Sequence, residues 1–233
     1  GLDPTDAAEA LRPHAAAIAA EAAALLRTAS GRRGVVAGTV RITASEVIGV
    51  EVLPPILAAL RRDHPGLVLE LALTSTVADL LRREADIAVR MVEPKQEALL
   101  VRRIGEVRLG LHARRDYLDR CGVPDSLEAL RDHALIGFDR ETAAISAMRR
   151  RVHGMDRALF ALRADSDLAQ LAAIRAGFGI GVCQAALAAR DPALMRVLAA
   201  HFDLPLPCWV AMHEAMARNR RCRVVFDALV QGL

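Results

Sequence analysis

The segment from Gly38 to Arg90 most constrains the fold, because its apolar pattern alternates between strand and helix spacing. Residues 40–43 alternate apolar and polar side chains, which is typical of a strand, and the residues that follow carry helical spacing. Residues 67–73 form a nearly continuous apolar run, so we expect a strand that is buried on both faces. Residues 86–90 are a third strand. The order strand, helix, strand, helix, strand predicts an α/β fold with a parallel sheet.

Polar side chains follow these strands, at the points where a parallel sheet binds its ligands. The carboxyl ends of parallel strands face helix N-termini, whose N–H groups have no partner within the helix. The candidates at these ends are Ser45, Glu46, Thr74, Ser75 and Arg90. Ser45 is either a helix cap or a ligand donor. Glu46 either contacts a ligand or is a solvated glutamate in the first helical turn.

Arg90 has two interpretations, because an isolated guanidinium at a strand end is costly to bury. It either clamps a ligand carboxylate or forms a salt bridge with Glu93 or Asp139. Further candidates follow two later predicted strands, and these are Phe138, Asp139, Asp165 and Asp167. Phe138 is either a core residue or an apolar wall against the ligand. Hydroxyl donors with one guanidinium predict an anionic or amide-bearing small molecule.

Four stretches of the chain together resemble the regulatory part of LysR-type transcriptional regulators. They are VRITASEVIGVEVLPPILAALRRDHPGLVLELALTSTVADLLRREADIAVRM, RRIGEVRLGLHARRDYL, DSDLAQLAAIRAGFGIGV and PCWVAMHEAMARNRRCRVVFDAL. The resemblance covers nearly the whole chain, in the order of the family. It implies two Rossmann-like lobes joined by two crossover strands, like a type 2 periplasmic binding protein, with an effector in the cleft between the lobes. The N-terminal winged helix-turn-helix of the family is absent, so we expect DNA binding only through a segment that these residues lack.

The resemblance also suggests how the chain is divided. The expected segments are a linker and dimerisation helix at 1–34, the first part of lobe I at 35–107, lobe II at 108–207, and the return to lobe I at 208–233. Each lobe is expected to combine helices with strands. The final return makes the second of the two crossings between lobes.

The N-terminal segment predicts one long helix that associates with another helix. Asp3 before Pro4 is the expected cap, and the following residues are rich in alanine. Leu11, Ile18 and Leu25 recur at the coiled-coil period, which indicates an apolar stripe. The helix either pairs with a second subunit or folds back on its own domain. The resemblance favours pairing, as a homodimer or a homotetramer.

Composition argues against several other kinds of protein. The net charge is +3, and the basic residues are spread along the chain, which is weak support for direct nucleic-acid binding. No apolar run is long enough to cross a membrane, so we expect no membrane contact. The four cysteines, Cys121, Cys183, Cys208 and Cys222, show no metal-binding or disulfide spacing. They are either incidental thiols or redox sensors.

Catalytic motifs are also missing from the sequence. Ser45 has no nucleophile-elbow glycines around it. The glycines at 177, 179 and 181 follow a predicted helix and precede a strand, which is the reverse of the dinucleotide-binding order. We therefore expect a cytoplasmic bacterial regulator with no enzymatic activity, cofactor or metal. The alternatives are a stand-alone solute-binding protein of the same two-lobe fold, and an enzyme on that fold.

Overall fold

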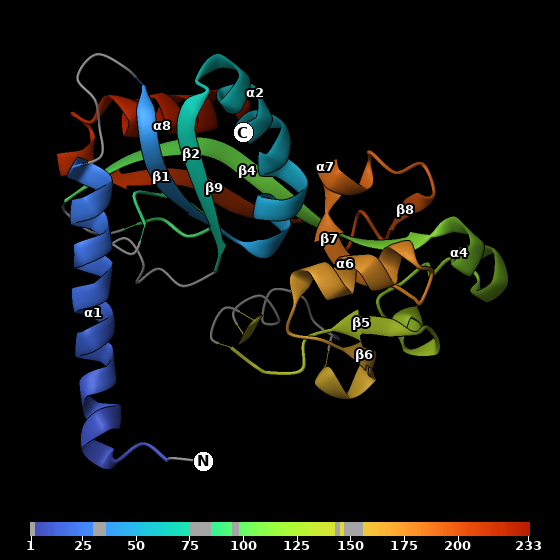
Figure 1. Cartoon of the computed structure of the whole chain (residues 1–233). Helices are drawn as coiled ribbons and strands as arrows, with labels where there is room; N and C mark the ends of the chain where they lie inside the picture. The colour runs from blue at the N-terminus through green and yellow to red at the C-terminus, as the bar shows by residue number, and fades with distance from the viewer. Residues whose placement is uncertain (1–2, 30–35, 75–84, 95–97, 143–144, 147–155) are drawn as a thin grey trace. The chain divides into compact units, whose positions relative to one another are not determined.

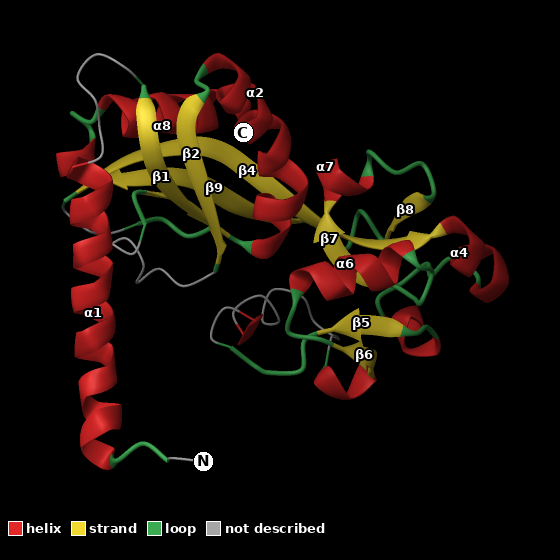
Figure 2. Ribbon diagram, in the orientation of Figure 1, coloured by secondary structure: helices red, strands yellow, loops and turns green. Residues whose placement is uncertain are grey.

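The computed structural model describes residues 3–29, 36–74, 85–94, 98–142, 145–146 and 156–233 (Figure 1). The chain divides into two compact units. Unit 1 comprises Gly1–Gly105 and Pro207–Leu233, and unit 2 comprises Glu106–Leu206. Both units combine helices with strands, as Figure 2 shows.

The sheet of unit 1 is organised around β1 (Ala37–Ala44), which lies between β2 (Gly66–Leu73) and β3 (Ile87–Arg90). β1 pairs in parallel with β2 on one side and with β3 on the other. β9 (Leu204–His213) is antiparallel to β3, and β4 (Leu99–Arg114) lies next to β9. The three parallel strands that the sequence predicts are therefore confirmed.

β2 corrects one expectation, because it is not buried on both faces. Val68, Leu71 and Leu73 are 55%, 37% and 42% exposed. In the described part of the chain β2 pairs only with β1, so it is an edge strand. An apolar run cannot distinguish an edge strand from a central one, since the position in a sheet depends on partners distant in sequence.

Two helices cover the buried face of this sheet. α2 (Leu53–Asp63) and α8 (Arg220–Gly232) contact each other and the strands β2 and β1, respectively. They contribute a set of buried apolar side chains, namely Leu53, Leu60, Val225, Phe226 and Leu229. A π-helical turn, Ile48–Val52, joins β1 to α2. Pro54 and Pro55 begin α2 and have no backbone N–H, so a regular α-helical ladder cannot pass through this point.

The N-terminal helix α1 (Asp6–Ala29) starts later than the sequence suggests. The Thr5 hydroxyl accepts a hydrogen bond from the Ala8 N–H at 3.3 Å, so Thr5 caps the helix. The prediction of Asp3 as the cap is wrong. Asp6 and Glu9 then place negative charge in the first turn, where the helix dipole favours it.

Unit 2 is built on the second half of β4. This half pairs in antiparallel fashion with β7 (Gly181–Gln184) and β8 (Leu194–Val197). A separate two-stranded parallel sheet consists of β5 (Leu135–Gly137) and β6 (Phe160–Arg163). Helices in the described part of the unit include α4 (Arg115–Cys121), α6 (Asp167–Arg175) and α7 (Ala185–Ala188). Short 3-10 turns occur at Glu128–Asp132 and Arg157–Leu159 in this unit, and at Glu214–Met216 in unit 1.

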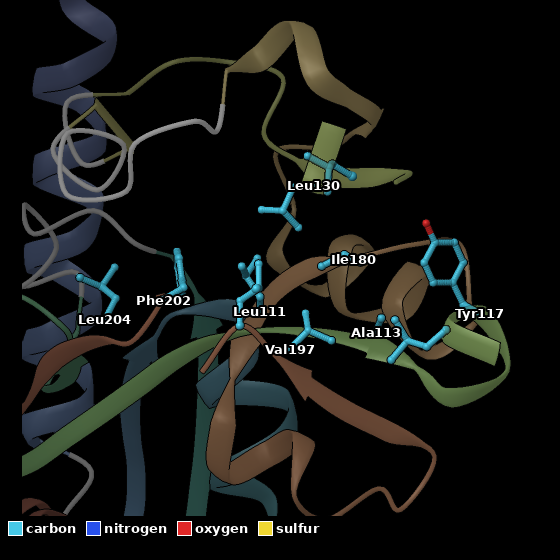
Figure 3. Packing of buried hydrophobic residues seen from close by; sticks show 11 residues of the cluster. Leu111, Ala113, Tyr117, Leu130, Ile180, Val197, Phe202 and Leu204 are labelled. Carbon is cyan, nitrogen blue, oxygen red and sulfur yellow. The ribbon is translucent and has the colours of Figure 1, made fainter. Parts of the chain in front are cut away.

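The core of unit 2 gathers residues from β4, α4, the Glu128–Asp132 turn, β5, β8 and β9 (Figure 3). Phe202 and Leu111 are each 1% exposed and belong to the same cluster. Gly179 allows a close approach nearby, because a Cβ at this position would lie 2.0 Å from the Ala134 carbonyl oxygen. The neighbouring Ile180 N–H donates to that oxygen at 2.9 Å, which ties β5 to the segment that leads into β7.

Two strands contain the boundaries between the units. β4 passes its boundary at Gly105, whose φ of +157° is one that residues with a side chain rarely adopt. β9 passes its boundary at Pro207, whose ring fixes φ and removes an N–H donor. The chain thus uses a glycine and a proline, residues of special backbone geometry, at its two crossings.

The core of unit 2 allows a direct stability test. We expect Phe202→Ala to lower the free energy of unfolding by about 3–5 kcal/mol, because it leaves a cavity in a packed cluster. Phe178→Ala removes the same side chain at a position that is 42% exposed, and it should change stability by about 0.5 kcal/mol or less. Urea unfolding followed by circular dichroism measures both. Equal losses in the two variants would contradict this assignment of the core.

Candidate functional site

The structure brings several predicted residues to one edge of the unit 1 sheet, namely the edge at which its three parallel strands end. Ser45 directly follows β1, and Glu46 is the first helical residue after it. The Thr74 N–H donates to the Ala44 carbonyl at 2.9 Å, which holds the end of β2 beside the end of β1. Parallel pairing therefore collects both polar turns at the same edge. Ser75 lies outside the described residues.

Arg90 is the last residue of β3 and joins this edge. Thr43 of β1 is in register with Ala88 of β3. Ser45 and Arg90 each follow their member of this pair by two residues, so they lie at the same level of the sheet. The Arg90 side chain is buried, with 6% exposure of the residue. One guanidinium nitrogen donates to the Val89 carbonyl at 2.9 Å, and the other donates to the Thr43 hydroxyl. These contacts fix the orientation of a cation at the strand end.

Two residues of this region were missed by sequence reasoning. Thr43 is 1% exposed and supplies an acceptor to Arg90, although its place in an alternating strand gives no sign of that role. Trp209 of β9 is in register with Arg90, directly across the β3–β9 pair. Its indole nitrogen is buried and has no hydrogen-bond partner among the residues that the structure describes. Both placements depend on strand pairing between segments far apart in sequence.

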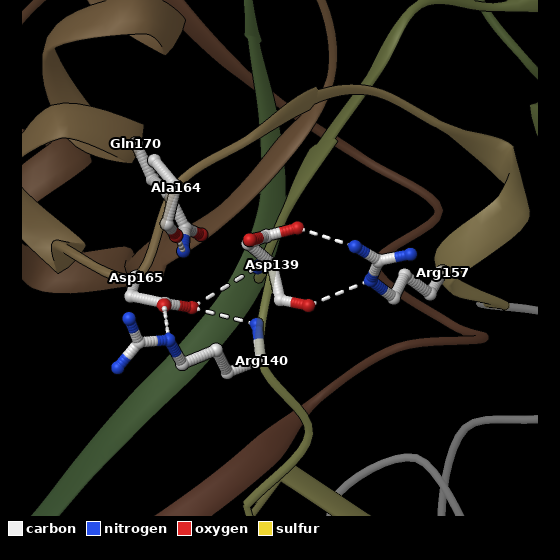
Figure 4. A network of polar contacts seen from close by, with 6 residues as sticks. All are labelled: Asp139, Arg140, Arg157, Ala164, Asp165 and Gln170. Atoms are coloured by element: carbon white, nitrogen blue, oxygen red, sulfur yellow. Dashed lines mark hydrogen bonds and ion pairs between the residues drawn. The ribbon is translucent and has the colours of Figure 1, made fainter.

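Two of the three predicted acidic residues of unit 2, Asp139 and Asp165, are engaged by arginines (Figure 4). The Asp139 carboxylate forms an ion pair with Arg157, and the Arg157 Nε donates to the Asp139 carbonyl at 2.6 Å. The Asp165 carboxylate accepts the N–H groups of Asp139 and Arg140 at 3.1 and 2.8 Å. It also forms an ion pair with Arg140 at 3.3 Å. The two carboxylates thus brace the segments that follow β5 and β6.

The remaining candidates of unit 2 have local structural roles. Phe138 follows β5 and is partly buried. Asp167 is the first residue of α6, and the cap before it is Ser166, whose hydroxyl accepts from the Ala169 N–H at 3.4 Å. Asp139 forms an ion pair with Arg157 within unit 2, and the salt bridge of Arg90 with Glu93 or Asp139 stays a prediction. Whether these residues face an effector stays a prediction.

The predicted stripe on α1 is exposed. Leu11, Ile18 and Leu25 are 63%, 71% and 68% exposed, at intervals of one heptad. A different face of the helix, rich in alanine, lines a hollow of about 720 Å³ together with Thr39, Arg41 and Glu70. Exposure of a regular stripe of large apolar side chains to water is unfavourable, and such a stripe commonly marks an interaction surface. The exposure is what a helix that pairs with another helix requires.

The thiols have surroundings that disfavour redox chemistry at three of the four positions. Cys183, Cys208 and Cys222 are buried, whereas Cys121 is exposed. Burial raises the pKa of Cys183 to about 12 and also raises the pKa of Cys208. These two thiols stay protonated at neutral pH and are poor nucleophiles. This favours the interpretation of the buried cysteines as incidental thiols.

Metal-binding clusters and membrane-spanning helices are both missing from the described part of the chain. No cluster of three or more histidine, cysteine or acidic side chains is arranged to hold a metal ion there. Within the same residues, no helix combines the length and the apolar character needed to span a bilayer.

Comparison with known proteins identifies the group to which these features correspond. The family described as the LysR substrate binding domain matches residues 33–233. The chain is 27% identical over 101 residues to the HTH-type transcriptional activator AaeR of Escherichia coli, which covers 43% of this chain and 33% of AaeR. The chain thus spans about a third of the length of such regulators.

Solved structures show the same fold. The regulatory domain of CrgA from Neisseria meningitidis is 24% identical, has a TM-score of 0.73, and is matched over 84% of this chain and 98% of that domain. Full-length AphB from Vibrio cholerae, a virulence activator, is 21% identical with a TM-score of 0.72, over 98% of this chain and 80% of AphB. These likenesses confirm the predicted fold class, that of type 2 periplasmic binding proteins.

The contact between Arg90 and Thr43 can be tested by stability. Thr43→Val keeps the shape of the side chain but removes an acceptor from a buried guanidinium, so we expect a loss of about 1–3 kcal/mol. Thr39→Val is the control on the same strand, because Thr39 accepts from Arg221 through its backbone carbonyl, which the change retains. Urea unfolding compares the two variants. A Thr43→Val chain as stable as Thr39→Val would show that the contact contributes nothing.

Proposed function

Because the chain belongs to the LysR substrate-binding domain family, we propose that it binds a small-molecule effector and regulates transcription as part of a larger protein. Its role is recognition rather than catalysis. Effector binding changes the balance between conformations, and the regulator responds to that shift. The match over residues 33–233 is the observation that carries this proposal.

We place the effector contacts of unit 1 at the edge where Ser45, Thr74 and Arg90 meet. The support is that parallel pairing of β1 with both neighbours gathers these groups at one end of the sheet. Hydroxyls and helix N-terminal N–H groups accommodate anions, and a guanidinium binds a carboxylate with charge-assisted hydrogen bonds. The effector is therefore anionic or amide-bearing. A cationic group on the same molecule would suit Glu46.

The proposal extends to how the larger protein works. AaeR is named as an HTH-type activator, and its match to this chain covers 33% of its length. We propose that DNA contact in the present protein comes from a helix-turn-helix segment outside the part described here, and that α1 pairs with a second copy to give a dimer or a tetramer. A regulator of this kind acts in the cytoplasm. The alternative of a transport solute-binding protein is not favoured, since the matched proteins are transcriptional regulators.

Substitution of Arg90 tests the proposed effector edge. A thermal-shift screen of small carboxylates, aromatic acids and amino acids first identifies an effector, and calorimetry then measures its affinity. We expect Arg90→Ala to weaken binding by about 1.5–3 kcal/mol, the scale of a lost charge-assisted hydrogen bond. Arg41→Ala is the matched control, because Arg41 lies on the same sheet but pairs with Glu70 at 3.1 Å. Full affinity in both Arg90→Ala and Ser45→Ala would place the site elsewhere.

Removal of the α1 stripe tests self-association. We expect the chain with Leu11, Ile18 and Leu25 changed to alanine to have a lower solution mass, because alanine preserves the helix but removes the apolar contacts. The control changes three exposed apolar residues elsewhere, Val92, Val123 and Phe178, to alanine. Light scattering measures the masses. A monomeric unmodified chain, or equal effects of both sets of changes, would argue against pairing through α1.

A further inference from the structure

Trp209 has a special place in the unit 1 sheet. It is the sole tryptophan of the chain. The antiparallel register of β3 and β9 sets Trp209 directly opposite Arg90. Residues paired in this way project to the same face of the sheet, with their Cβ atoms about 4.5–5.5 Å apart. The indole and the guanidinium therefore start from neighbouring positions on one face.

The indole nitrogen of Trp209 is a buried donor without an acceptor. Nε1 is inaccessible and makes no hydrogen bond within the described part of the chain. Buried tryptophan N–H groups usually find a partner, because an unsatisfied donor loses its hydration without compensation. A few unsatisfied groups do persist in native proteins, and each one calls for a physical reason. A tryptophan at this position carries a cost that phenylalanine would not, which points to a use for the N–H.

The chemistry of the neighbouring groups defines which ligand could accept a hydrogen bond from this indole N–H. Arg90 offers only donors, and the Thr43 hydroxyl oxygen already accepts from Arg90. The indole adds one more donor and no acceptor. A ligand that suits this set brings acceptors of its own, and a carboxylate has two oxygens that can be shared between two nearby donors.

We propose that Trp209 is an effector-binding residue, whose indole N–H donates to one oxygen of an effector carboxylate that Arg90 also binds. This inference rests on the proposed function and narrows the effector from an anionic or amide-bearing molecule to a carboxylate. It adds a specificity-determining residue on β9 to those on β1, β2 and β3. Because Nε1 is buried, side chains around the indole must shift for the carboxylate to reach it.

The sole tryptophan provides its own probe. The unmodified chain is titrated with sodium benzoate and with sodium acetate while the Trp209 emission is recorded, with sodium chloride at matched ionic strength as the salt control. Benzyl alcohol controls for the aromatic ring. We expect a saturable change in emission with the carboxylates, and no such change with the two controls. In Arg90→Ala this change should be lost, whereas Arg41→Ala should retain it.

An isosteric replacement isolates the N–H group. Replacing Trp209 by benzothienylalanine keeps the bicyclic shape but substitutes sulfur for the N–H. Without benzoate, we expect an unchanged or higher midpoint of thermal unfolding, because no hydrogen bond is lost. Because this variant has no tryptophan, calorimetry measures its affinity for benzoate. We expect that affinity to be about tenfold lower than in the unmodified chain, the equivalent of one net hydrogen bond. Trp209→Phe is a second variant that lacks the N–H, and it should show the same loss of benzoate affinity.

The outcomes separate this inference from the proposed function. If benzoate binds in an Arg90-dependent manner and the benzothienylalanine chain binds it equally well, the role of Trp209 is wrong and the effector edge stands. A lower unfolding midpoint of that chain without benzoate would show that the N–H already has a partner, which also overturns the role. If neither carboxylate stabilises or perturbs the unmodified chain, carboxylate recognition at this edge is contradicted together with the role of Trp209.

Discussion

The parallel pairing of β1 with both β2 and β3 is the constraint on which the unit 1 site depends. Because all three strands run in the same direction, the turns that follow them meet at one edge. The backbone bond from Thr74 to Ala44 holds two of these turns together at 2.9 Å. At the opposite end of β3, Asp86 and Arg41 exchange two hydrogen bonds, each of 2.9 Å, which secure the register. A slip of one residue would turn Arg90 to the other face.

Burial of Arg90 has a cost that its neighbours reduce. A guanidinium removed from water needs hydrogen-bond acceptors, and those of Arg90 include the Val89 carbonyl and the Thr43 hydroxyl. Both of these acceptors are neutral, and they orient the guanidinium at the end of β3. A cation held in this way attracts a carboxylate more strongly than one on the surface, because local screening by water is weaker. The same arrangement thus stabilises the end of the sheet and suits the proposed carboxylate effector.

The sequence predicted the local elements better than their surroundings. The strand at residues 40–43, the helix with Leu53 and Leu60, and the polar ends at Ser45 and Arg90 were all visible from apolar periodicity. The exposure of β2 was not, because it follows from its edge position in the sheet. Long-range pairing also determines which residues neighbour Arg90. No local pattern connects Arg90 with Thr43 or Trp209.

The acidic residues of unit 2 show a second limit of local reasoning. Asp139 and Asp165 were predicted from their positions at strand ends, which the structure reproduces. Their arginine partners were not predicted, because Arg157 begins a short 3-10 turn and Arg140 lies in irregular structure, where neither helix nor strand period applies. A carboxylate engaged in an ion pair and in backbone hydrogen bonds is poorly disposed to bind a cationic ligand. This contrast between engaged carboxylates in unit 2 and a donor-rich edge in unit 1 favours an acidic effector.

The position of Trp209 connects recognition to the strands that cross between the units. It lies two residues after Pro207, where β9 enters unit 1, and it pairs with the last residue of β3. A ligand changes a conformational balance only by as much as it prefers one state over another. An indole N–H that is unsatisfied without the effector and bonded with it provides such a preference, of about one hydrogen bond. Because that donor sits on β9, the proposed carboxylate contact lies on a strand that has residues in both units.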